Sequence, residues 1–267
     1  MSKIVASALF SPSYRRLASS WGWVREDFAE EFRQLEAAGA WQDEACSTRI
    51  WGTRHKWVRK VQTPSGRMVV YKRLHHVVAP VKFMLRPSPS GREAWNYQCL
   101  QQLGLPMARL LAVGDVRRCF ILKSCFLVTE YAENTRDGRD FLPNGSLVGE
   151  TALRDAFLDS VLQGLAKLHD QGWVHGGSTP ANFLYRRQGD SIIPVWIDVA
   201  TCCRPPHFLR RRRLTEEFVR LFAPFHFTPE ERRRYEEIYL GHRLAPCFTL
   251  DSLFAAVEAR LSQCAKH

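Results

Sequence analysis

The segment from residue 165 to 198 constrains the fold of this chain more than any other. It reads LAKLHDQGWVHGGSTPANFLYRRQGDSIIPVWID. Apolar residues at helical spacing predict a helix that ends near His169, and Gly172 is expected to form a turn after it. His175 then opens a polar loop, and two short apolar runs around residues 188–190 predict a hairpin that ends at Asp198. A helix, a loop and a hairpin in this order indicate a mixed α and β architecture.

Asn182 and Asp198 stand at the two ends of the predicted hairpin. Amide and carboxylate oxygens are hard ligands that suit Mg²⁺, and Mg²⁺ commonly neutralises nucleotide phosphates in proteins. The alternative interpretation is that Asn182 caps a turn and that Asp198 caps a helix. The ordered elements around the two residues favour a magnesium site.

The first half of the chain is predicted to be rich in strands. An amphipathic helix over 24–40 ends near Gly39, and strand character runs over 47–74 with a turn at 63–66. A helix over 90–103 is broken by Gly104 and Pro106, and two further strands are predicted over 110–113 and 120–131.

The second half is predicted to be mainly helical. A polar segment over 132–150 precedes a long helix over 151–171, and the chain beyond residue 204 is helical and rich in Arg. We therefore expect an α+β fold of two lobes with a cleft between them. The expected divisions are a helical extension over 1–45, a β-rich N-lobe over 46–132 and a mainly helical C-lobe over 133–267.

The composition indicates a globular protein with an anionic partner. Apolar residues make up 45% of the chain, and the formal net charge is +11. No apolar run is long enough to cross a membrane, and the first ten residues lack the apolar core of a signal peptide. None of the eight cysteines forms a CxxC pair, so free and mostly buried thiols in a reducing compartment are expected.

The spacing of several polar residues resembles that of protein-kinase-like proteins. These proteins carry H-x-D-x-x-x-x-N, then a hairpin, then an Asp after an apolar strand. The wording LHDQGWVHG, NFLY and WIDVA is most similar to the lipopolysaccharide kinase family, the Kdo/WaaP and InaA-like group. The resemblance covers roughly residues 45–245. It implies a protein with a two-lobed protein-kinase-like fold, and it implies that this protein uses ATP and Mg²⁺.

The resemblance assigns a role to matching residues in the first half of the chain. Lys72 would contact the α- and β-phosphates of ATP, and Glu93 would be its partner on the following helix. Glu130 and Tyr131 would border the adenine. Taken alone, Lys72 also suits the surface of an edge strand, and Glu93 suits the start of any helix.

In the second half, the resemblance makes His175 the start of a catalytic loop and makes Asn182 and Asp198 the metal ligands. The basic run Arg210, Arg211, Arg212 and Arg213 lies where such a fold shapes its acceptor site. It would bind acceptor phosphates or an anionic membrane face. The alternative is a solvated helical face that Glu216 and Glu217 partly balance.

Two departures from the family pattern stand out. No glycine-rich loop precedes Lys72, and Gly177 stands where the catalytic-loop Asp is expected. That Asp accepts the proton of the attacking hydroxyl, and general bases contribute about 10²–10⁴-fold to such rates. Asp170 precedes the turn and is not expected to replace it. A slow kinase, a kinase with a relocated base and a pseudokinase all remain open.

The family resemblance implies a kinase that phosphorylates a sugar hydroxyl of the lipopolysaccharide inner core. Such a protein would be cytoplasmic, with peripheral contact at the cytoplasmic face of the inner membrane left open. The second interpretation is a pseudokinase that serves as a nucleotide-binding or scaffold protein in envelope biogenesis. A nucleic-acid partner is not expected, because no recognised nucleic-acid motif is present and the basic residues are scattered.

Overall fold

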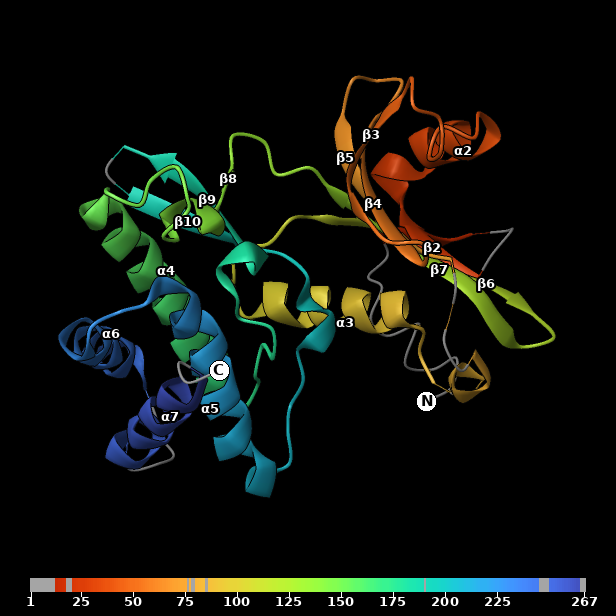
Figure 1. The fold of residues 1–267 in the computed structure, drawn as a ribbon. Coiled ribbons are helices and arrows are strands. Elements are labelled where there is room, and N and C mark those ends of the chain that lie inside the picture. The colour runs from red at the N-terminus through yellow and green to blue at the C-terminus, as the bar shows by residue number, and fades with distance from the viewer. Residues whose placement is uncertain are drawn as a thin grey trace. The chain divides into compact units, whose positions relative to one another are not determined.

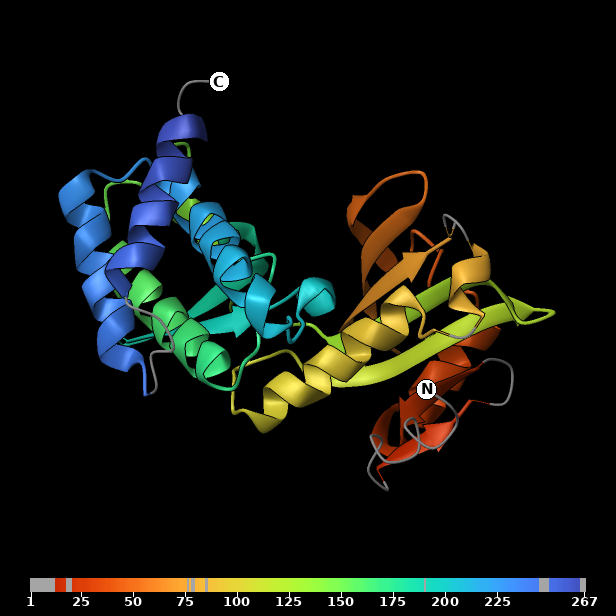
Figure 2. The ribbon, with the colours of Figure 1, turned by 90° about the horizontal axis from the view of Figure 1, so that it is seen from below.

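The computed structural model divides into two compact units (Figures 1 and 2). The first comprises Met1–Gln98 and Ala108–Ala132, and the second comprises Cys99–Met107 and Glu133–His267. The structure describes residues 13–17, 21–75, 77, 80–84, 86–189, 191–244 and 250–264.

The first unit is built on a seven-stranded antiparallel sheet in the order β1-β2-β6-β7-β5-β4-β3. The predicted strands are present, and β6 is longer than expected. The strands are β1 (Tyr14–Arg16), β2 (Trp21–Arg25), β3 (Ser47–Gly52), β4 (Lys56–Gln62), β5 (Met68–Leu74), β6 (Leu110–Arg118) and β7 (Ile121–Glu130).

Residues 1–45 are more than the helical extension that the sequence predicted. The predicted helix is present as a 3-10 turn, η1 (Glu26–Phe28), and α2 (Ala29–Ala37), but β1 and β2 precede it and join the sheet through β6. The strands were missed because β2 is short and Gly22 interrupts it. Gly22 is needed there, since a Cβ would lie 2.3 Å from the Val113 carbonyl oxygen.

Helix α2 packs on the sheet through aromatic side chains. Phe32 stacks on Phe126 of β7 with ring centroids 5.7 Å apart, and Trp41 stacks on Tyr71 of β5 at 4.3 Å. All four side chains are buried. Burial of such side chains stabilises a fold by about 1.5–3 kcal/mol each, so this contact holds β5 rigidly in the sheet.

Helix α3 (Pro89–Gln102) follows β5 after a short 3-10 helix, η2 (Pro80–Phe83). Ser88 accepts a hydrogen bond from the Gly91 N–H at 3.0 Å and so satisfies one of the free amides at the helix start. Glu93 and Ala94 are buried on the first turns of this helix. The helix therefore presents Glu93 to the strands of the first unit.

The second unit contains the remaining long helices. They are α4 (Thr151–Asp170), α5 (His207–Phe222), α6 (Pro229–His242) and α7 (Leu250–Cys264). Phe157, Val161, Leu165 and Leu168 of α4 are fully buried, as the helical spacing predicted. A capping box between Thr228 and Glu231 fixes the start of α6.

A small antiparallel sheet in the order β10-β9-β8 lies beside α4 in the second unit. Its strands are β8 (Arg136–Asp137), β9 (Phe183–Gln188) and β10 (Ser191–Trp196). Trp196 is fully buried, and a Cβ at Gly164 of α4 would lie 2.6 Å from its ring. The glycine therefore allows the helix to approach the hairpin closely.

One smaller expectation from the sequence is wrong. Cys46, Cys119 and Cys203 are exposed free thiols, while Cys125 and Cys202 are buried, so the described cysteines are not mostly buried. On β3, Trp51 is about half exposed, with Lys56 over its ring. Among the helices that the structure describes, none has the length and apolar character needed to span a bilayer.

Candidate functional site

Lys72 and Glu93 form a buried ion pair in the first unit. The Lys72 Nζ lies 2.7 Å from Glu93 Oε1, and the two side chains are 15% and 5% exposed. Lys72 lies on β5 opposite Leu127 of β7, so the sheet fixes the start of its side chain. A charge pair held this way presents an ammonium group with few alternative positions, as phosphate binding requires.

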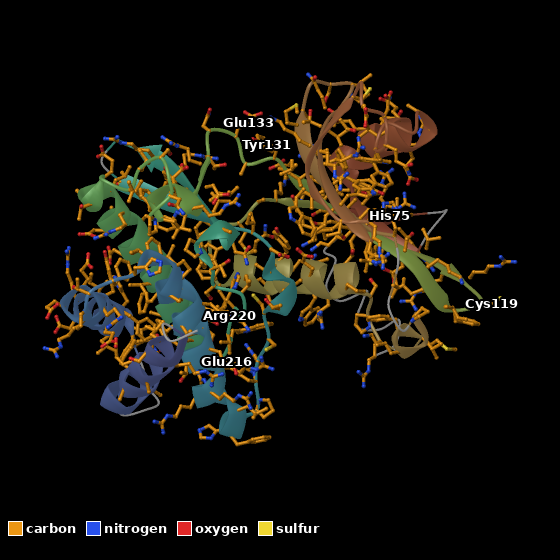
Figure 3. All side chains as sticks on the ribbon, in the orientation of Figure 1. His75, Cys119, Tyr131, Glu133, Glu216 and Arg220 are labelled. Carbon is orange, nitrogen blue, oxygen red and sulfur yellow. The ribbon has the colours of Figure 1, made fainter. Side chains whose placement is uncertain are left out.

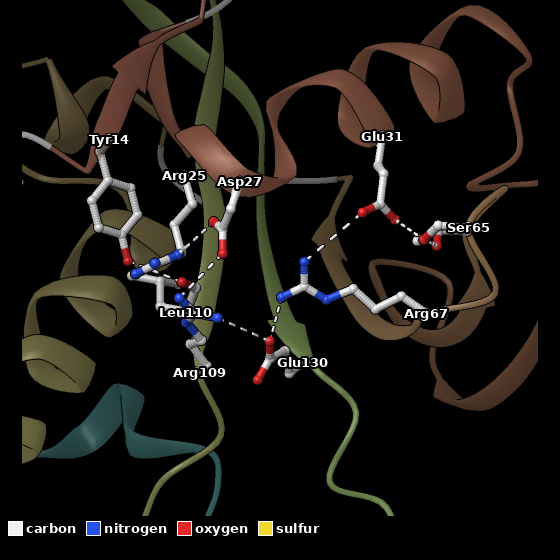
Figure 4. A network of polar contacts seen from close by, with 10 residues as sticks. Tyr14, Arg25, Asp27, Glu31, Ser65, Arg67, Arg109, Leu110 and Glu130 are labelled. Carbon is white, nitrogen blue, oxygen red and sulfur yellow. Dashed lines mark hydrogen bonds and ion pairs between the residues drawn. The ribbon is translucent and has the colours of Figure 1, made fainter.

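Glu130 lies at the end of β7 in a network of polar contacts (Figure 4), and Tyr131 follows it directly. Glu130 Oε1 pairs with Arg67 and lies 3.5 Å from the Arg109 guanidinium. The Glu130 N–H donates to the Arg109 carbonyl oxygen at 2.9 Å, and the Tyr131 N–H donates to the Met68 carbonyl oxygen at 3.0 Å. These bonds fix the end of the strand. That Glu130 and Tyr131 border the adenine stays a prediction.

His175 opens the predicted catalytic loop and is fully buried. Its Nδ1 accepts a hydrogen bond from the Gly177 N–H at 3.2 Å, and its ring packs against Phe183 and Trp196. Burial lowers the pKa of His175 below its ordinary value, although Glu217 and Asp198 oppose the shift. His175 is therefore a neutral group that shapes the loop from inside.

The buried neutral state of His175 predicts an acid-sensitive fold. The unfolded chain takes up this proton below about pH 6.5, whereas the folded chain resists it, so stability falls as the pH drops below that value. One such group changes the free energy of unfolding by at most about 1.4 kcal/mol per pH unit. Urea unfolding from pH 8 to pH 5 should show a steeper loss for wild type than for His175→Gln, and equal slopes would contradict the assignment.

Glu217 of α5 holds the loop that follows His175. It is fully buried, and its Oε2 accepts the Gly176 N–H at 2.9 Å. Its Oε1 lies 2.9 Å from His169 Nε2. Burial alone would raise the pKa of Glu217, but His169, His175 and the Gly176 N–H together lower it. An ionised carboxylate inside the second unit therefore anchors the loop backbone.

Gly176 has a positive φ of 73°, a conformation that a residue with a side chain rarely adopts. Its carbonyl oxygen accepts a hydrogen bond from Arg220, which Figure 3 labels on α5 together with Glu216. Both backbone groups of Gly176 are thus bound by side chains of one helix. Neither Glu217 nor Arg220 was identified from the sequence as a partner of the loop, because each lies more than 40 residues from Gly176 along the chain.

Asn182 lies at the end of the loop in a 3-10 turn, η4 (Pro180–Asn182). Its Nδ2 donates to the Gly177 carbonyl oxygen at 2.6 Å, which leaves the amide oxygen for another ligand. The Asn182 carbonyl oxygen also accepts the Ile197 N–H at 3.0 Å. That bond joins Asn182 to the residue that precedes Asp198.

Asp198 follows β10 and begins a 3-10 turn, η5 (Val199–Thr201). Its φ of 52° is unusual for a residue with a side chain, and such strained residues cluster at functional sites. Its side chain does not cap the turn that follows, which removes one of the alternatives from the sequence. The hairpin places Asn182 beside Ile197, the residue before Asp198, and the role of the two residues as metal ligands stays a prediction.

The donor set of this hairpin fits Mg²⁺ better than zinc or another soft metal. One amide oxygen and one carboxylate are hard ligands that a magnesium ion combines with water and phosphate oxygens. No group of three or more His, Cys, Asp or Glu side chains suited to a metal occurs among residues with described positions. A site of this kind therefore depends on the nucleotide to supply further ligands.

The four predicted anion-binding arginines divide into two groups. Arg210 is partly buried and donates to the His169 carbonyl oxygen, so it stabilises the end of α4. Arg211, Arg212 and Arg213 are exposed, and the last two pair with Glu216 at 2.9 and 3.5 Å. The expectation that Glu217 balances this run is wrong, because Glu217 faces the interior instead.

Asp170 is engaged elsewhere in the second unit and does not replace the missing loop carboxylate. Its Oδ1 accepts from Arg243 Nε at 2.6 Å, and its Oδ2 accepts the Leu244 N–H at 2.9 Å. Its side chain is 6% exposed. The structure thus agrees with the expectation from the sequence.

Comparisons with known proteins support one fold and one family. A structure titled "WaaP in complex with acyl carrier protein" has a TM-score of 0.65 and 16% sequence identity, covering 91% of this chain and 98% of that chain. The family model described as "Lipopolysaccharide kinase (Kdo/WaaP) family" matches residues 45–234. No match was found among curated proteins.

The similarity to WaaP defines a kinase-like α+β fold, as the sequence predicted. Because the family model covers more than half of the residues, the chain belongs to the lipopolysaccharide kinase (Kdo/WaaP) family. The family resemblance that the sequence showed is thereby confirmed.

Proposed function

We propose that this protein uses ATP and Mg²⁺ to phosphorylate a sugar hydroxyl of the lipopolysaccharide inner core. The buried Lys72–Glu93 pair at 2.7 Å is the observation that carries the proposal. A lysine on the exposed surface of a strand does not require a buried carboxylate partner. Burial of both charges is unfavourable unless further contacts or a function offset its cost. Membership of the family supports the choice of acceptor.

Each proposed residue has a separate task. Lys72 binds the α- and β-phosphates, and Glu93 fixes the position of its ammonium group. Asn182 and Asp198 supply oxygen ligands for Mg²⁺, which would neutralise charge on the phosphates. Glu130 and Tyr131 border the adenine through the end of β7, and the exposed Arg211, Arg212 and Arg213 bind phosphates on the acceptor. The protein acts in the cytoplasm, at the inner membrane.

The acceptor hydroxyl meets no carboxylate at position 177, where Gly177 stands. Positioning and electrostatic stabilisation supply most of the catalysis of phosphoryl transfer, so a slow reaction remains without a general base. Gly177 also favours a second candidate function. In that case the protein is a pseudokinase that binds nucleotide through Lys72 and Asp198 and acts as a scaffold in envelope biogenesis.

Calorimetry of ATP binding with and without Mg²⁺ tests the nucleotide site. We expect Mg²⁺-dependent binding that weakens by roughly 10–100-fold in Lys72→Ala and in Asp198→Ala, since each substitution removes a charged partner of the phosphates or the metal. Lys123→Ala is the matched control, because Lys123 is an exposed lysine of β7 in the same sheet. Binding that is equal in all four proteins would overturn the site.

Transfer of labelled phosphate to purified lipopolysaccharide core then separates the two functions. Transfer that depends on Asp198 supports the kinase. Nucleotide binding without any Asp198-dependent transfer supports the pseudokinase. The same assay with core lacking phosphates tests the arginine run, since acceptor binding through Arg211 to Arg213 requires an anionic acceptor.

A further inference from the structure

The turn between β6 and β7 places an aromatic residue in an unfavourable backbone conformation. Cys119 and Phe120 form this two-residue turn, and both have a positive φ, of 49° and 64°. Turns of this geometry strongly prefer Asn and Gly, because a larger side chain is strained there. A residue that strains the backbone without a packing role indicates a function in which the side chain itself is used.

The Phe120 side chain does not pack in a core. It is 65% exposed, and Figure 3 shows the neighbouring Cys119 at the free end of the hairpin. Three more apolar side chains of the same unit are exposed nearby along the hairpin and the adjoining segment: Val81 at 62%, Met84 at 44% and Val116 at 44%. Exposed apolar groups that gather at one place commonly mark an interaction surface.

One largely buried arginine holds the two segments together. Arg117 Nη1 donates to the Phe83 carbonyl oxygen at 2.7 Å and also to the Phe120 carbonyl oxygen at 3.4 Å. Its Nη2 and Nε bind Asp115 Oδ2 at 2.8 and 3.2 Å. Arg117 therefore holds the turn and the 3-10 helix η2 beside each other. Both segments carry exposed apolar side chains.

In the described parts of the two segments that carry these side chains, the exposed charges are all positive. Lys82, Arg86, Arg118 and Lys123 are exposed. Residues 80–87 and 116–124 contain no Asp or Glu, and the nearest acidic residue, Asp115, is paired with Arg117. Basic side chains surrounding exposed apolar groups are complementary to a layer with anionic head groups above a hydrocarbon interior.

We propose that this surface docks on an anionic lipid bilayer. We call it the hairpin-tip patch and define it as Val81, Lys82, Met84, Arg86, Val116, Arg118, Phe120 and Lys123. Phe120 enters the region of the head groups, and the basic side chains contact lipid phosphates. Phe120 lies at the projecting end of the hairpin, a shape that a fluid layer accepts without a matching pocket, whereas a folded protein partner needs one.

The proposal deepens the proposed function, because docking would bring the kinase to an acceptor carried by lipid. Its test requires neither ATP nor acceptor, so the two proposals fail separately. The full chain is sedimented with vesicles of phosphatidylcholine alone and with vesicles containing phosphatidylglycerol. We expect binding that depends on the anionic lipid and weakens as salt is added.

Phe120→Asn is the decisive variant, because Asn accepts a positive φ and the hairpin should fold at least as well as in wild type. We expect the vesicle partition coefficient to fall about tenfold, the effect of withdrawing one large apolar side chain from lipid. The double variant Arg118→Ser with Lys123→Ser should lower it by a similar factor. Val148→Asn is the control, since Val148 is 52% exposed in the second unit.

Three results would overturn the proposal. In the first, wild type does not bind the anionic vesicles. In the second, Phe120→Asn binds the anionic vesicles as wild type does, while Phe208→Asn does not bind them. The lipid contact would then lie at the exposed Phe208, beside the arginines of α5. In the third, the patch variants lose binding to an acidic protein while vesicle binding is unchanged, which would make the patch a protein interface.

Discussion

Replacing Gly177 with Asp should raise the rate of phosphoryl transfer to the lipopolysaccharide acceptor by about 10²–10⁴-fold, the usual contribution of a positioned general base. The φ of Gly177 does not lie in the left-handed region, so the backbone accepts a side chain. A new Cβ would lie 3.0 Å from Thr201 Oγ1 and 3.4 Å from Asn182 Nδ2. The carboxylate would thus emerge beside a proposed magnesium ligand, where the acceptor hydroxyl is expected.

Thr201 must yield by a few tenths of an ångström to accept this side chain. Its hydroxyl donates to the His175 carbonyl oxygen at 2.9 Å, so a double variant combines Gly177→Asp with Thr201→Ala to relieve the contact. Gly177→Asn is the matched control, because it has the size of Asp but does not accept a proton. Equal rates for the Asp and Asn variants, measured by transfer of labelled phosphate, would show that no general base is missing.

Glu217→Ala should lower the free energy of unfolding by about 3–5 kcal/mol, as expected when a buried carboxylate that binds two buried partners is removed. The substitution leaves His169 and the Gly176 N–H without their buried partner. Whole domains are stable by about 5–15 kcal/mol, so this loss is a large fraction of the total. Urea unfolding followed by fluorescence measures it.

The effect of Glu217 should extend through a chain of buried contacts in the second unit. His169 Nδ1 lies 2.8 Å from the Tyr239 hydroxyl, which accepts from Arg243 Nη1 at 2.6 Å. The network therefore joins the loop at Gly176 to α4, α5 and α6. Glu216→Ala is the matched control on the adjacent position, since an exposed pair of this type contributes about 0–1 kcal/mol. A similar loss in the two variants would contradict the anchoring role.

The sequence alone determined the elements that depend on local patterns. Apolar side chains at helical spacing defined α4, and strand patterns with Gly66 and Gly189 at the turns defined the hairpins. The segments LHDQGWVHG, NFLY and WIDVA, in their order and spacing, were sufficient to identify the family. Such signals are short in range, so the chain reveals them without a structure.

Only the tertiary structure revealed the contacts that span large separations in sequence. Glu217 and Gly176 are 41 residues apart, and nothing in the local pattern distinguishes the buried Glu217 from the partly exposed Glu216 beside it. The hairpin-tip patch likewise depends on Arg117 joining two segments that are 34 residues apart. Helix packing and sheet pairing determine which polar side chains are buried against each other, because burial depends on the whole fold. The residue type determines only which hydrogen bonds or ion pairs a buried side chain can form.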